Sequence, residues 1–199
     1  GPLQRRETDR RKARPFRPDM VVYSATMLDT RLMEIHLCDL FRGHAPVPPG
    51  YEFVRETLRA AGLTDEDLRT DAQDRLVHKD DVKRKLRPHY WGLYDRTLAA
   101  LAAGGGSDGV PLALIVIPRV GKADAPEARA EPVARLAGMA AHHALPVFDL
   151  SGTFDGRDPS QFEIAAWDDH PNAPGHHRLF LALTRALVSL GEYGIAGAI

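Results

Sequence analysis

The chain has 199 residues, of which 44% are hydrophobic and 27% charged, and its formal net charge is −1 at pH 7. This composition is typical of one folded, soluble domain with its own core, and it excludes a chain that is disordered throughout. The near-zero net charge gives no overall field that would draw the chain to nucleic acid or to an anionic membrane.

The first 18 residues are predicted to form a basic arm or partial helix. Between Arg5 and Arg17 the chain has seven basic and two acidic residues. Such a block could bind phosphate or lipid headgroups, although a charge run is more often a solvated helix face. The opening Gly1-Pro2 is typical of a scar left by tag cleavage, so we expect the natural chain to start differently. No signal peptide or membrane-spanning apolar run is visible, and the compartment is unknown.

Residues 19–199 are predicted to form an α/β domain built on three strands, at 19–26, 110–117 and 145–150. These runs are rich in β-branched, aromatic and aliphatic residues. They are apolar without alternation, which indicates strands covered on both faces, as in a parallel sheet flanked by helices. We expect the second strand to follow a turn at Gly104-Gly105-Gly106.

Helical patterns occupy the stretches between and after the strands. They are expected at 31–41, 51–61, 64–68, 90–103, 127–142 and 174–190. This alternation predicts a layered α/β fold with right-handed crossovers. The segment 42–88 is too long for a simple crossover and carries many charges, so we expect a helical insertion or lid there.

The pattern with the clearest chemical meaning is Asp168-Asp169-His170, expected in a loop directly before the last helix. A carboxylate beside an imidazole can orient the ring and stabilise its protonated form while the ring takes a proton from a nucleophile. Sites in open α/β sheets form beyond the carboxyl ends of the strands. At that edge Thr26, Asp29 and Arg119 are further candidates for binding substrate or an oxyanion.

This C-terminal region resembles the closing block of the SGNH (GDSL-like) hydrolase and acetyltransferase superfamily. Members often contain an aspartate, one further residue and a histidine, followed by asparagine and Gly-His-Arg. The corresponding residues here are Asp168, His170, Asn172 and the run 175–178. The strand at 19–26 is similar to the third strand of the family, and the strand at 110–117 to its fourth.

The resemblance implies a three-layer α/β/α, flavodoxin-like parallel sheet that lacks its first two strands. It also implies an esterase or acyltransferase of the Ser-His-Asp type, in which Asp168 and His170 are the base half and no cofactor takes part. The substrate would be a small acylated or carbohydrate molecule.

Two features depart from the family pattern. The Gly-Asp-Ser block that carries the nucleophile is not found, and Leu28 stands at the position of the oxyanion asparagine. Loss of one such donor commonly costs about 2.7–4 kcal/mol of transition-state stabilisation. Ser151 follows a predicted strand and has a superficial likeness to a Gly-Asp-Ser turn, but ordinary turn chemistry explains it more simply.

Three explanations of the missing strands stay open. The chain belongs to a larger hydrolase completed by a second polypeptide or a dimer mate. It is a catalytically degenerate member that acts as a binding or interaction module through its sheet edge and basic arm. Or the missing strands are drawn from the segment 42–88.

The acid and histidine cluster also has two other interpretations. Asp168, Asp169, His170 and one of His176 and His177 offer enough oxygen and nitrogen ligands for zinc or manganese. The family-like spacing explains these residues without a metal, so no metal is assigned. Alternatively, an aspartate simply caps the last helix and His170 is a structural side chain.

Two further predictions concern single side chains. Arg119 and Lys122 could bind a substrate carboxylate or sugar, with solvated loop charges as the equal alternative. Cys38 is the only cysteine, which excludes an intrachain disulfide, and a buried, inert thiol is expected.

Overall fold

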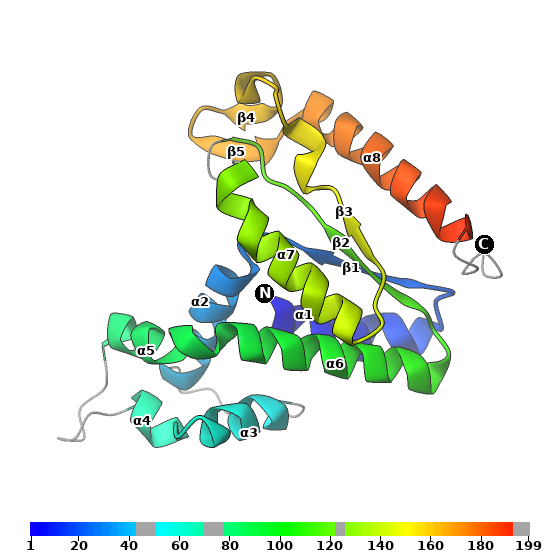
Figure 1. The fold of residues 1–199 in the computed structure, drawn as a ribbon. Coiled ribbons are helices and arrows are strands. Elements are labelled where there is room, and N and C mark those ends of the chain that lie inside the picture. Colours follow the sequence, from blue (N-terminus) through cyan, green and yellow to red (C-terminus); the bar gives the residue numbers. More distant parts are fainter. Residues whose placement is uncertain (43–50, 70–77, 122–125, 193–199) are drawn as a thin grey trace. The chain divides into compact units, whose positions relative to one another are not determined.

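The computed structural model describes residues 1–42, 51–69, 78–121 and 126–192 (Figure 1). The chain divides into two compact units. The helical unit comprises Gly1–Lys12 and Leu28–Ala100, and the sheet unit comprises Ala13–Met27 and Leu101–Ile199. Each unit is therefore assembled from segments that are far apart in the sequence.

The sheet unit contains a three-stranded parallel sheet in the order β1-β2-β3. Its strands are β1 (Val21–Ala25), β2 (Leu112–Val116) and β3 (Val147–Asp149). Every residue of β2 is buried, as its continuous apolar run predicts for a central strand. The three predicted strands and their parallel pairing are therefore confirmed.

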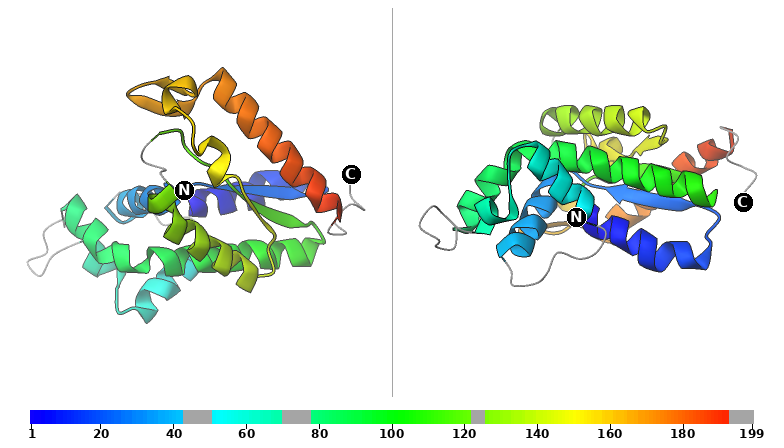
Figure 2. Two further views of the ribbon diagram at one scale, coloured as in Figure 1. Left: turned by 45° about the horizontal axis from the view of Figure 1, so that its top comes forward. Right: turned by 90° about the horizontal axis from the view of Figure 1, so that it is seen from below.

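Two helices of the sheet unit match predicted ones, α7 (Pro126–His142) and α8 (Ala173–Glu192). Helix α7 connects β2 to β3 and packs against β3. Helix α8 contacts the short helix η5 (Ser151–Phe154), which follows β3. Figure 2 shows both helices beside the sheet, so the coarse α/β prediction is correct.

Helix α6 (Tyr90–Asp108) is longer than predicted, and the expected turn at Gly104-Gly105-Gly106 is wrong. All three glycines are helical. A Cβ atom on Gly105 would lie only 2.9 Å from the carbonyl oxygen of Val110. Glycine is needed there because the chain leaving the helix folds back against it on the way to β2.

The helical unit contains the first part of α6, up to Ala100, and the helices that precede it. Their bounds are α1 (Pro2–Thr8), α2 (Asp29–Arg42), α3 (Glu52–Ala60), α4 (Asp65–Arg69) and α5 (Lys79–Leu86). The helices expected at 31–41, 51–61 and 64–68 are confirmed. Helices α3, α4 and α5 lie within the segment 42–88, and α4 and α5 contact α2.

The basic arm begins with α1 and continues through the π turn η1 (Asp9–Ala13) and the 3-10 turn η2 (Arg14–Phe16). Its charges are largely matched within the helical unit. The carboxylate of Glu7 accepts hydrogen bonds from Arg10 and Arg11, both at 3.0 Å. This pairing favours the interpretation of the arm as a solvated helix face over its interpretation as a phosphate-binding segment.

Cys38 is buried in α2 as predicted, and its thiol donates to the carbonyl oxygen of Lys79 at 3.6 Å.

Within the described ranges, no helix combines the length and the apolarity that crossing a bilayer requires.

Candidate active site

Asp168 and His170 lie on a strand, so the expectation of a loop at this position is wrong. The strand is β5 (Asp168–Pro171), and it pairs antiparallel with β4 (Glu163–Ala165). The hairpin has almost no sequence signal, because its strands are short and β5 consists of acids, histidine and proline, which seldom form strands. Its register also shifts within β4.

The side chains of Asp168 and His170 form a close pair. Nδ1 of His170 lies 2.5 Å from Oδ1 of Asp168, and the same oxygen accepts the backbone N–H of His170 at 3.1 Å. These two hydrogen bonds hold the pKa of Asp168 below its usual range, and the bond from the imidazole has the larger effect. The ionised carboxylate accepts a hydrogen bond from Nδ1–H, which leaves Nε2 as the basic nitrogen.

Asn172 fixes the hairpin to the start of α8. Its Nδ2 donates to the carbonyl oxygens of Gln161 and Glu163, at 3.1 and 3.0 Å, and its Oδ1 accepts the N–H of Gly175 at 3.0 Å. A Cβ atom on Gly175 would lie 2.7 Å from the carbonyl oxygen of Phe162. The asparagine and glycine that follow His170 therefore hold its strand in place.

The imidazole of His170 is open to solvent, with 74% of its side chain exposed. In the described part of the chain, no serine hydroxyl is hydrogen-bonded to it. The hydroxyls of Ser107 and Ser189 donate to carbonyl oxygens of their own helices, and that of Ser160 donates to Asp158. Ser151 is only 5% exposed, and its N–H donates to the carboxylate of Asp149, a turn contact.

A cavity of about 560 Å³ lies beside β5. Asp169 and Trp167 line it, whereas Asp168 and His170 do not. The guanidinium of Arg119 pairs with the Asp169 carboxylate and also lines the cavity. Arg119 thus joins the neighbourhood of the dyad.

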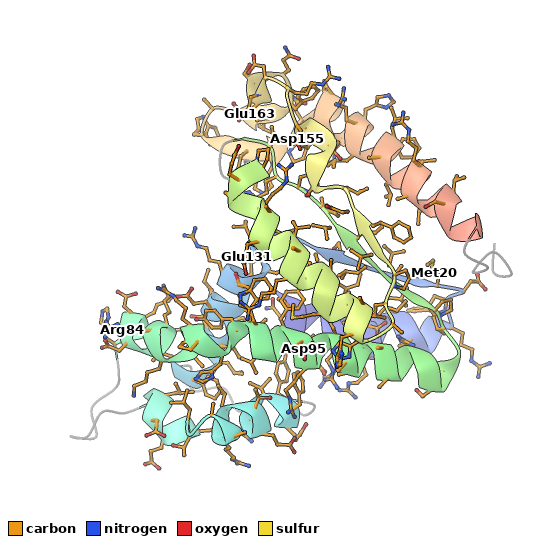
Figure 3. All side chains as sticks on the ribbon, in the orientation of Figure 1. Met20, Arg84, Asp95, Glu131, Asp155 and Glu163 are labelled. Carbon is orange, nitrogen blue, oxygen red and sulfur yellow. The ribbon has the colours of Figure 1, made fainter. Side chains whose placement is uncertain are left out.

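Sequence reasoning missed three other polar residues of this cavity, Asp158, Ser160 and Glu163. Glu163 extends from β4 (Figure 3), a strand with no sequence signal. Ser160 belongs to the 3-10 turn η6 (Pro159–Gln161), where the side chain of Asp158 accepts its N–H. The Asp158-Pro159-Ser160 sequence is typical of such a turn and could have located Ser160 near a strand end.

The remaining predicted site residues do not form one group with the dyad. Thr26 directly follows β1 and is partly buried. Asp29 belongs to the helical unit, where it is 1% exposed. Its carboxylate lies 2.5 Å from Nη1 of Arg5 and accepts the hydroxyl of Tyr94 at 2.9 Å, so it is engaged inside that unit. Lys122 lies outside the described residues.

The metal interpretation has partial geometric support. One ligand atom each from Asp168, Asp169 and His170 lies within 4.8 Å of the others. One oxygen of each carboxylate already accepts a hydrogen bond, from His170 and Arg119 respectively. His176 and His177 are exposed on α8 and are not part of this group.

The chain matches no protein-family model, no curated protein and no solved structure. The likeness to SGNH hydrolases therefore rests on the residues of the closing block. The geometry of the Asp168–His170 pair is the structural observation that bears on it.

Proposed function

We propose that this chain supplies the aspartate–histidine half of an SGNH-like ester hydrolase or acyltransferase that acts on a small acylated or carbohydrate substrate. The observation that carries the proposal is the 2.5 Å contact between Asp168 Oδ1 and His170 Nδ1, with a backbone hydrogen bond to the same oxygen.

The chemistry assigned to the pair is that of a general base. Nε2 of His170 takes the proton of a serine hydroxyl as that oxygen attacks the acyl carbon, and then returns it to the leaving oxygen. Asp168 holds the ring and stabilises the imidazolium. Arg119 and the cavity that it lines are the proposed place for the polar part of the substrate.

The serine is assigned to a second polypeptide or to a further stretch of the same chain. Two observations support this. The exposed ring of His170 has room for an incoming hydroxyl. Strand β1 is an outer strand of the three-stranded sheet, and its Val22 is 44% exposed. A flavodoxin-like three-layer sheet would place its missing strands beyond β1.

Ester hydrolysis by the natural protein tests the proposal. The protein is isolated from its host with any polypeptide that stays bound, and kcat/KM is measured on short-chain nitrophenyl esters. We expect His170→Ala to abolish the activity and Asp168→Asn to lower it by about 10⁴-fold, the loss typical of a triad whose acid is neutralised. His176→Ala is the matched control, because His176 is exposed on α8, and it should keep full activity. Equal activity in His170→Ala would refute the proposal.

A second candidate function is a catalytically degenerate SGNH-like domain that acts as a binding module. It is favoured by Leu28 at the oxyanion position and by exposed apolar side chains on α8, namely Phe180 at 60% and Val188 at 67%. In that case the folded wild-type protein has no esterase activity, and His170→Ala leaves partner binding unchanged.

A further inference from the structure

A second cavity, also of about 560 Å³, lies within the helical unit. One wall is the beginning of α2, which contributes Arg31 and Ile35. The other is the continuous run of α5, η3 (Arg87–His89) and the start of α6, which contributes Lys83, Arg87 and Trp91. The last three residues are spaced by four, so they project from one face of the helical run.

The charged side chains of this cavity leave an excess of positive charge. Among the lining residues that the structure describes, the only acid is Glu34, which accepts a hydrogen bond from Arg87 at 3.3 Å. Lys83 lies 3.7 Å from the carboxylate of Asp80, a long ion pair. Arg31 is exposed and has no hydrogen-bond or ion-pair partner in the described part of the chain. Three cations thus face one carboxylate.

Two of the uncharged residues that line the cavity, Tyr90 and Trp91, are aromatic. The indole of Trp91 is partly exposed and held beside the ring of Tyr94, with centroids 6.1 Å apart. Ile35 is 38% exposed on the opposite wall. Tyr90 forms part of the floor, and its hydroxyl donates to the carbonyl oxygen of Lys83 at 3.3 Å. Burial raises the pKa of Tyr90 well above its usual value, so it stays neutral.

We propose that this cavity binds an organic phosphate that carries a planar ring, of the size of a mononucleotide. Its volume is within the range of small-molecule sites. The guanidinium of Arg31 can form two parallel hydrogen bonds to a phosphate, with the Lys83 ammonium as a second charge. A ring can stack on Trp91, as bases do on aromatic side chains. The site is separate from the dyad and does not depend on the function proposed for it.

Ligand binding can be followed through the fluorescence of Trp91, which lines the cavity. The chain has two tryptophans, so in a Trp167→Phe background the fluorescence reports on Trp91 alone. We expect adenosine monophosphate to change this fluorescence saturably. Arg31→Gln should weaken binding by about 10- to 100-fold, which corresponds to a hydrogen bond to a charged group. Arg84→Gln is the matched control. Arg84 lies on α5 (Figure 3) outside the cavity. It pairs with Asp81 and its side chain is 75% exposed, so its loss should leave affinity unchanged.

Two further probes separate the parts of the ligand. Adenosine lacks the phosphate and inorganic phosphate lacks the ring, so each should bind at least about tenfold more weakly than the nucleotide. Adenosine binding as tightly as the nucleotide would overturn the role of the cations, and equal binding of inorganic phosphate would overturn the role of Trp91. Equal losses in Arg31→Gln and Arg84→Gln, or no saturable change in protein with a folded circular dichroism spectrum, would overturn the site itself.

Discussion

Two aspartates show how the surroundings of a residue decide its role. Asp168 lies at the surface and holds the imidazole of His170, two residues away. Asp29 is buried and accepts hydrogen bonds from Arg5 and Tyr94, which are 24 and 65 residues away in the sequence. The first pair is local, so its spacing predicts it. The second depends on the packing of three helices, and nothing near Asp29 in the sequence indicates it.

The pH dependence of Asp168 follows from its two hydrogen bonds. Because the pKa of Asp168 is lower in the folded protein, the contact stabilises the folded state at pH values above the usual aspartate pKa. This stabilisation is lost as the pH falls through the lowered pKa. In a carbon-13 NMR titration of the Asp168 carboxyl, His170→Ala should raise the midpoint toward the ordinary value. The rise should be incomplete, because the backbone N–H of residue 170 still donates. His176→Ala should leave the midpoint unchanged, and an unchanged midpoint in His170→Ala would show that the contact is not formed.

Among the helices and strands, the sequence predicts those in which apolar residues form a regular pattern. The all-apolar run of β2 is the clearest case. Helices are also expected at the positions of α2, α3, α4, α6, α7 and α8. The hairpin of β4 and β5 has no such pattern, because its strands are held by pairing with each other and by Asn172 rather than by apolar burial. The site was therefore predicted at the level of the Asp168–His170 pair, while the strand that carries it and the Glu163 side of the cavity were not.

The glycines at the end of α6 allow a matched test of why a helix, rather than a turn, forms there. Alanine is the better helix former, so Gly106→Ala, with no atom within 4 Å of the new Cβ, should stabilise the protein by about 0.5–1 kcal/mol. Gly105→Ala should destabilise it by about 1–3 kcal/mol, because its Cβ would meet the Val110 carbonyl at 2.9 Å. Urea unfolding measures both. Equal stabilisation by the two substitutions would mean that the close approach does not exist.

At the scale of the whole molecule, the division into a helical and a sheet unit could not be predicted from the sequence. The helical unit joins the N-terminal arm to residues 28–100, and its core includes Leu3, Met33 and Tyr94. These residues have ordinary helical patterns, and only the fold reveals that they share a core. The dyad belongs to the sheet unit and the proposed phosphate cavity to the helical unit. Each unit thus carries one candidate site that can be tested separately.

The central claim is that His170 serves a serine that lies outside residues 1–199. Fluorophosphonate labelling followed by peptide mapping of the natural protein, with any bound polypeptide, tests it most directly. We predict one labelled serine that lies outside this sequence, and no labelling in the His170→Ala variant. Labelling that persists without His170, an adduct on one of the chain's own serines, or a folded protein that takes no label would each contradict the claim.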